Sequence, residues 1–241
     1  TTKAVTEVKT LTNFYVFGNF SADQAAWNEQ IFNNEPNTAV YYWQQGKHYR
    51  FGAYANGEAG QIADARYDAA TQVLTFPDYT PDNTKALVAA TTPADASQAI
   101  PTEPVSLSFG HMLSQVGFTF NTEVGKEYTL AIRNIKINKA IRTATGTYEA
   151  PATINWQGEA DLAGEETNKA SQFKLVIPQQ VPTEGASQIT VSFTASISGG
   201  GLSDAAEKTF EIELASPGEG GWKPGFRYNY TATINGDNIT N

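Results

Sequence analysis

The sequence contains no cysteine, which excludes disulfide bonds, thiolate metal sites and cysteine nucleophiles from the 241 residues. It contains only two histidines, His48 and His111, and these leave little basis for a metal site built on imidazole ligands. Neither the Gly-x-Ser-x-Gly elbow of hydrolases nor the Gly-Lys-Ser/Thr ending of a phosphate-binding loop occurs. We therefore expect no cofactor, no metal and no catalytic residues, and hence a protein that is not an enzyme.

Charged residues are also sparse, at 17% of the sequence, and they are unbalanced. Asp and Glu number 25 against 16 Lys and Arg, which gives a formal net charge of −9. Because binding to a phosphate backbone requires a basic surface, nucleic acid is not an expected partner. No apolar run is long enough to cross a bilayer as a helix.

The many Thr, Ser, Asn, Gln and Ala residues favour an exported protein. The chain opens on Thr1 without the apolar core of a signal peptide. We expect that an upstream leader has been removed from an exported precursor, together with any cysteine that carried a lipid.

Aromatic residues are abundant, at 12% of the sequence, and favour sheets over helices. Alternation of apolar and polar residues predicts strands at 105–109 and 116–121, separated by a kink at Gly110 and His111. A strand is also predicted at 39–43, whereas 21–37 reads as a short helical turn or an irregular flap. The pattern as a whole predicts an all-β protein.

The length of the chain suits two β domains of ordinary size. Residues 93–104 contain three prolines among small residues and no regular apolar pattern, which predicts a semi-rigid linker. The predicted organisation is an N-terminal β-sandwich at 1–92, this linker, and a C-terminal β-sandwich at 105–241.

One short phrase occurs in both halves with the same spacing of Trp, Gly and two aromatic residues. It reads WQQGKHYRF from Trp43 and WKPGFRYNY from Trp222. Glycine permits a turn, and aromatic residues two positions apart share one face of the strand that follows. The match indicates either duplicated domains or a common way for β proteins to begin a strand.

Some residues invite a more specific interpretation. His111 could serve as a general base, but a structural histidine at a sheet kink is favoured because no triad partner is evident. An acidic stretch lacks the spacing of an EF-hand and is interpreted as a solvated loop; it comprises Glu159, Asp161, Glu165 and Glu166. A set of aromatic side chains could form a platform for sugar rings, although core positions are the commoner role: Trp27, Tyr41, Tyr42 and Trp43.

Five segments together resemble the fimbrillin-like proteins of Bacteroides-type bacteria: FYVFG, YYWQQGKHYRFGAYA, PVSLSFGHMLSQVGFTF, KLVIPQQ and GWKPGFRYNYTATI. Their order fits across nearly the whole chain. The resemblance implies two tandem β-sandwich domains of transthyretin-like build. It also implies secretion through a lipoprotein precursor to the cell outer membrane, and assembly there into a fimbrium as a pilus subunit.

The same resemblance implies that a trypsin-like protease removes an N-terminal strand, after which the exposed groove accepts a strand from the next subunit. In this sequence the removable strand would precede Phe14 and the donor would lie near or beyond Ile239. Because the first arginine is Arg50, the expected cut falls at Lys3 or Lys9.

The expected partners are therefore other fimbrial subunits, the processing protease, and a host or bacterial surface ligand for adhesion. The alternative hypothesis is a secreted carbohydrate-binding β-sandwich module.

Overall fold

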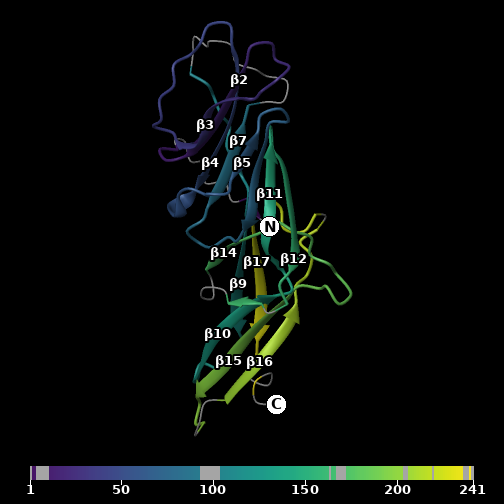
Figure 1. Cartoon of the computed structure of the whole chain (residues 1–241). Helices are drawn as coiled ribbons and strands as arrows, with labels where there is room; N and C mark the ends of the chain where they lie inside the picture. Colours follow the sequence, from purple (N-terminus) through teal and green to yellow (C-terminus); the bar gives the residue numbers. More distant parts are fainter. Residues whose placement is uncertain are drawn as a thin grey trace. The chain divides into compact units, whose positions relative to one another are not determined.

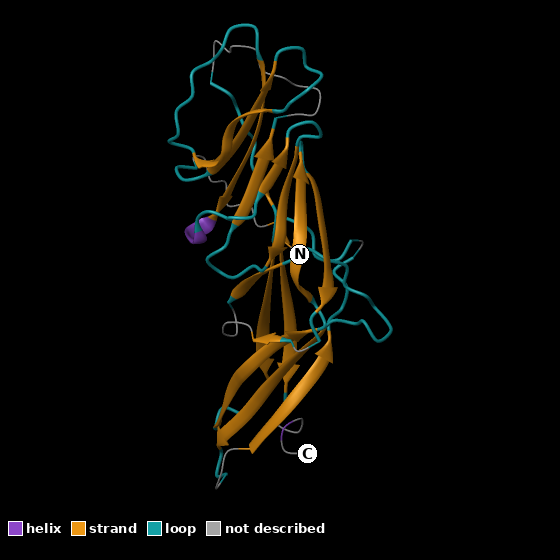
Figure 2. Cartoon of the chain, viewed as in Figure 1, coloured by secondary structure: helices purple, strands orange, loops and turns teal. Residues whose placement is uncertain are grey.

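A computed structural model of the chain describes residues 2–3, 11–92, 104–162, 164–166, 172–202, 206–218, 220–235 and 239. Strands form nearly all of the regular structure in these ranges (Figure 2), alongside a 3-10 turn, η1, at Gly57–Ala59. This confirms the predicted all-β class. Across the same ranges, no helix has the length and apolar character needed to span a membrane.

The contacts within the chain divide it into two compact units. The N-terminal unit comprises 5–113 and 143–158, and the C-terminal unit comprises 1–4, 114–142 and 159–241. This division differs from the predicted linear one, because residues 143–158 belong with the first half. The predicted linker at 93–104 lies, apart from Pro104, outside the described residues and stays a prediction.

The N-terminal unit contains two antiparallel sheets (Figure 1). The first has the order β3 (Glu29–Pro36), β2 (Tyr15–Ser21), β4 (His48–Asn56), β7 (Leu87–Thr91) and β8 (Gly110–His111). The second has the order β12 (Thr153–Ala160), β11 (Ile141–Glu149), β6 (Val73–Tyr79) and β5 (Arg66–Asp68). The sheets pack face to face through aromatic rings, because Tyr54 of β4 lies 5.3 Å from Phe76 of β6 between ring centroids.

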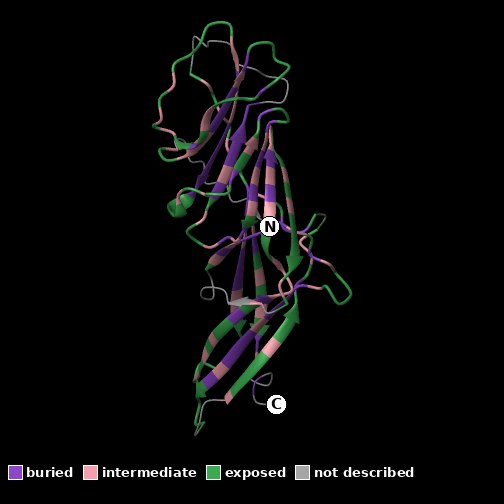
Figure 3. Ribbon diagram, in the orientation of Figure 1, coloured by how far each residue is buried: buried purple, intermediate pink, exposed green. Residues whose placement is uncertain are grey.

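The C-terminal unit also contains two sheets. One has the order β1 (Thr2–Lys3), β17 (Phe226–Ile234), β9 (Ser114–Thr122) and β14 (Phe173–Val176). The other has the order β13 (Glu165–Glu166), β10 (Tyr128–Asn138), β15 (Thr190–Gly199) and β16 (Ala206–Glu213). Phe120 of β9 packs 4.6 Å from Phe193 of β15, which joins the two sheets across the core. The central strand β15 is largely buried, whereas the edge strand β16 is largely exposed (Figure 3).

Three predicted segments differ from the structure. Residues 105–109 form no strand; Phe109 instead packs edge-on against Phe14, 5.6 Å away between ring centroids. The predicted flap at 21–37 contains the eight-residue strand β3. Its pairing with β2 shifts register on both sides of Gly18, and such bulges hide the period-two alternation. Residues 39–43 form no strand, and Tyr41 and Trp43 pack edge-on against Phe32 and Tyr49. The transthyretin-like build remains a prediction.

Candidate functional site

The repeated phrase forms the same turn in both units. Gly46 and Gly225 both have left-handed backbone angles, with φ of 73° and 76°. In the first copy the amide of Gln44 donates a hydrogen bond of 2.7 Å to the hydroxyl of Tyr49. In the second the amide of Lys223 donates a hydrogen bond of 2.9 Å to the hydroxyl of Tyr228. The shared spacing thus encodes one structural element, placed before β4 and again before β17.

Trp27, the first residue of the predicted aromatic platform, is buried at 6% exposure. The Arg50 guanidinium lies 4.0 Å from the centroid of its ring, and the Trp27 carbonyl accepts a hydrogen bond from the Asn19 side chain. Trp27 therefore stabilises its own unit and presents almost no ring surface to a ligand.

The other three platform residues belong to the loop of residues 37–46, between β3 and β4. Tyr41 packs edge-on against Phe32 at 6.1 Å, and Trp43 packs edge-on against Tyr49 at 4.4 Å. Because Tyr49 and Tyr54 are an odd number of positions apart on β4, these contacts cover the sheet face opposite the core that holds Tyr54. Tyr42 points away from these contacts and is 84% exposed.

The first expected processing residue, Lys3, lies in β1 at the edge of the C-terminal unit. The pairing of β1 with β17 joins Thr2 to Arg227 and Lys3 to Phe226. Beyond this, residues 228–234 of β17 have no strand partner on that edge among the described residues. Lys9 lies outside the described residues. Among the described residues, β1 thus supplies an edge strand that covers the start of β17.

A second incomplete edge lies on the other side of the same unit. β14 pairs with β9 only from Ser114 to Gly117, and β13 pairs with β10 only at Lys136 and Ile137. Residues 118–122 of β9 and 128–133 of β10 therefore lack a partner on this side in the part of the chain that the structure describes.

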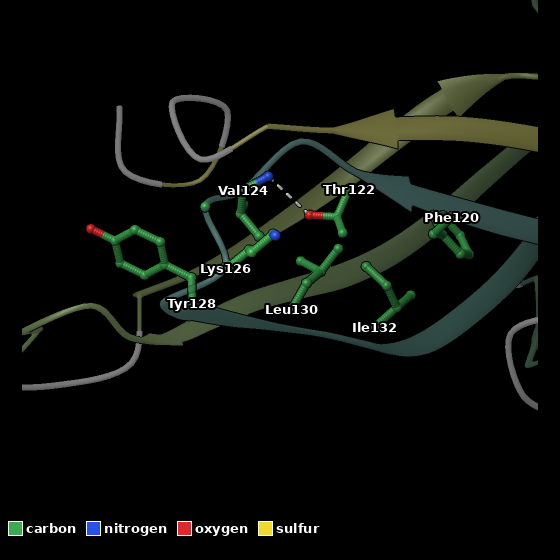
Figure 4. Close-up of a pocket in the computed structure, with 8 residues that line it drawn as sticks. Phe120, Thr122, Val124, Lys126, Tyr128, Leu130 and Ile132 are labelled. Carbon is green, nitrogen blue, oxygen red and sulfur yellow. Dashed lines mark hydrogen bonds between the residues drawn. The ribbon is translucent and has the colours of Figure 1, made fainter.

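The unpaired edges of β9 and β10 lie on either side of a groove of about 480 Å³, here called the β9–β10 groove (Figure 4). Its lining is Phe120, Thr122, Val124, Gly125, Lys126, Tyr128, Leu130 and Ile132. Four of these side chains are partly buried hydrophobic groups that pack against the core of the unit: Phe120, Val124, Leu130 and Ile132. The groove is therefore an open end of the hydrophobic core.

The turn that closes one end of the groove is held by two hydrogen bonds. The Val124 amide donates to the Thr122 hydroxyl at 3.1 Å (Figure 4), and the Tyr128 amide donates to the Gly125 carbonyl at 3.0 Å. Lys126 is the single charged residue of the eight that line the groove. Such a groove can accept apolar side chains and backbone hydrogen bonds.

Two other strands at sheet edges in the described residues carry charge, which discourages pairing with another chain. The edge strand β16 has four charged positions: Glu207, Lys208, Glu211 and Glu213. The edge strand β3 contains Glu29 and Glu35 and ends at Pro36. By contrast, residues 118–122 and 128–132 contain no charged side chain. The β9–β10 groove therefore differs from these two edges, and it shares its lack of charge with residues 228–234 of β17.

The residues considered for chemistry are dispersed. No group of three or more His, Asp or Glu side chains that could hold a metal occurs within the described ranges. His111 lies on the two-residue strand β8, where burial lowers its pKa. Asp161 pairs with Arg142 at 3.3 Å, and Glu165 and Glu166 form β13.

The sequence profile of the fimbrillin-like family matches residues 1–241. This chain belongs to the fimbrillin-like family. The resemblance predicted from five segments of the sequence is thereby confirmed. A search of curated proteins found no match to this fimbrillin-like chain.

A crystal structure from Bacteroides uniformis ATCC 8492, of a protein provisionally described as a cell adhesion protein, is similar to the fimbrillin-like chain. The two share 18% sequence identity, with a TM-score of 0.50 over 92% of this chain and 87% of that chain. At this level of identity the similarity concerns the fold alone.

The β9–β10 groove of this fimbrillin-like protein was not predicted from the sequence. The alternating apolar residues of β9 and β10 were visible as strands, and they form the lining. The groove is open because the neighbouring strands are short: β13 has two residues and β14 has four. The sequence does not predict these lengths.

Proposed function

We propose that this fimbrillin-like protein is a subunit of a cell-surface fimbrium that assembles by donor-strand exchange and contributes to adhesion. The observation that carries the proposal is the edge of β17. A two-residue strand, β1, covers its start, while residues 228–234 lack a strand partner among the described residues. Unpaired backbone groups on an exposed edge are satisfied when another chain adds a strand.

In this proposal a trypsin-like protease cuts at Lys3 or Lys9 and removes β1. The edge of β17 then opens along its whole length, and a segment near or beyond Ile239 of a neighbouring subunit pairs with it. The core supports such an exchange, because Tyr228 and Ile234 of β17 are buried and hold the edge in place without β1. The partners are other fimbrial subunits, the protease and a surface ligand, after export through a lipoprotein stage to the outer membrane.

The experiment compares the wild-type chain with a Lys3→Gln/Lys9→Gln double variant during digestion with a trypsin-like protease. Mass spectrometry identifies the cut, and size-exclusion chromatography with electron microscopy detects polymers. We expect protease treatment to convert the wild type, but not the double variant, into polymers. Lys136→Gln, at an exposed lysine of β10, is the matched control. Trimmed wild type that stays monomeric, or a double variant that polymerises equally, would contradict the proposal.

The carbohydrate-binding alternative depends on exposed aromatic surface in the loop of residues 37–46. Tyr42 is 84% exposed and adjacent Trp43 is 38% exposed. We rank this function second because Trp27 is buried and Tyr41 and Trp43 pack onto their own sheet. Titration with soluble glycans tests it: a sugar that shifts tryptophan fluorescence of the wild type, but not of a Tyr42→Ser variant, would favour this alternative.

A further inference from the structure

The β9–β10 groove is a partly exposed apolar surface, and the strand edges beside it lack partners among the described residues. Phe120, Leu130 and Ile132 remain partly exposed beside the core. The backbone edges on both sides are unpaired over about five residues each. A segment that fills the groove must supply apolar side chains and free backbone groups, and it must avoid burying an unpaired charge.

The loop of residues 37–46 has these properties. Val40 and Tyr42 occupy alternate positions and are 78% and 84% exposed. The residues that follow each of them, Tyr41 and Trp43, pack onto their own sheet. They are the closest pair of strongly exposed large apolar residues in the described ranges. Residues 37–46 contain no charged side chain.

The backbone of this loop is also available. The Ala39 amide bonds to Pro36, and the Gln44 amide bonds to the Tyr49 hydroxyl. Between them, no backbone hydrogen bond involves Val40 to Trp43 in the part of the chain that the structure describes. The loop is thus held at both ends by its own unit and presents unpaired backbone together with two apolar side chains.

We propose that the loop of residues 37–46 docks, through Val40 and Tyr42, into the β9–β10 groove of a second copy of this chain. Both surfaces are uncharged except for Lys126, whose ammonium can lie over the ring of the docked tyrosine. Val40 and Tyr42 are exposed, and the occupant in this proposal is the loop of another molecule.

The two surfaces belong to different units of the chain, so the contact is heterologous. Repetition of a heterologous contact extends an assembly instead of closing it, unless the rotation happens to close a ring. This inference rests on the proposed fimbrial function and deepens it, because it names a contact between subunits that requires no proteolytic removal of β1.

The absence of native cysteine permits a direct test by cross-linking. Val40→Cys and Thr122→Cys variants of the uncleaved chain are mixed and oxidised, and heterodimers are measured on non-reducing gels. Leu162→Cys is the matched control, because Leu162 is 79% exposed and Val40 is 78% exposed. We expect the Val40→Cys and Thr122→Cys pair to cross-link at least about tenfold faster than the control pair, since docking raises the local concentration of the thiols.

Adding Tyr42→Asp to the Val40→Cys chain is expected to reduce cross-linking to the control rate. Tyr42 is exposed, so circular dichroism should show that this variant folds. Cross-linking at the control rate, or a rate unchanged by Tyr42→Asp, would overturn the inference.

The outcomes are separable from those of the protease experiment. Polymers that form after trimming without Val40–Thr122 cross-links would overturn the docked loop and leave strand exchange standing. Cross-links in a chain that never polymerises after trimming would support the docked loop and contradict strand exchange.

Discussion

The hydroxyl group in the repeated turn offers a quantitative test of the structure. Tyr228→Phe removes the acceptor that receives the Lys223 amide at 2.9 Å, and Tyr49→Phe removes the acceptor that receives the Gln44 amide at 2.7 Å. Both rings are buried, at 4% and 0% exposure, and each substitution retains its ring. The two variants therefore isolate the same hydrogen bond in two different units.

We expect each substitution to lower the free energy of unfolding of its unit by about 0.5–1.5 kcal/mol, the usual net value of one hydrogen bond. With a urea dependence of about 1–3 kcal/mol/M, the midpoint of unfolding falls by roughly 0.2–1.5 M. Tyr42→Phe serves as control, because its exposed side chain predicts a change within about 0.5 kcal/mol.

The assay must resolve the two units, and the tryptophans allow this. Trp222 lies in the C-terminal unit, whereas Trp27, Trp43 and Trp156 lie in the N-terminal unit. Fluorotryptophan labelling gives each unit its own fluorine NMR signals during urea titration. Tyr228→Phe should shift the Trp222 transition, and Tyr49→Phe the others. A loss well above 3 kcal/mol, or no loss in either variant, would refute the assignment of one shared hydrogen bond.

Three further predictions concern the N-terminal unit. Tyr54→Phe should cost about 1–3 kcal/mol in chemical denaturation, because the Tyr54 hydroxyl bonds at 2.7 Å to the buried Asn34 side-chain oxygen, which would lose its partner. Burial raises the pKa of Tyr54 from 10.0 to about 12 and also raises the pKa of Tyr79. Unfolded tyrosine releases its proton first, so pH titration of stability should show full stability below pH 10 and a loss as pH rises towards 12. Gly46→Ala should cost about 1–2 kcal/mol in thermal unfolding, because φ is 73° and a methyl group would meet nothing within 4 Å, which leaves only backbone strain.

The sequence predicted those strands whose alternation is local and uninterrupted. β4 and β15 are examples, and turns or glycines bound them. β3 was missed because the bulges in its partner β2 displace the apolar side chains from a strict period of two. Residues 105–109 alternate but pair with no strand in the part of the chain that the structure describes, so alternation by itself does not establish pairing.

The composition of the two units and the β9–β10 groove could not be predicted from the sequence, because both depend on pairing between distant strands. Residues 143–158 join the N-terminal unit because β11 pairs with β6, as at Ala144 and Tyr79. No local sequence pattern predicts that pairing. The β9–β10 groove exists because β13 and β14 are short, which depends on where their hydrogen bonds stop. The aromatic residues Tyr41, Tyr42 and Trp43 were identified, but adjacent positions in a loop gave no indication of which one faces solvent.

The parallel pairing of β17 with β9 has a consequence for how the protein comes to be made. Arg227 pairs with Gln115 and Ile234 with Thr122, so β9 gains its β17 partner only after residues 227–234 have been made. During synthesis the N-terminal unit can complete itself once residue 158 has emerged from the ribosome. The C-terminal unit completes this sheet only once residue 234 has also emerged, so the N-terminal unit can fold while that sheet is still open.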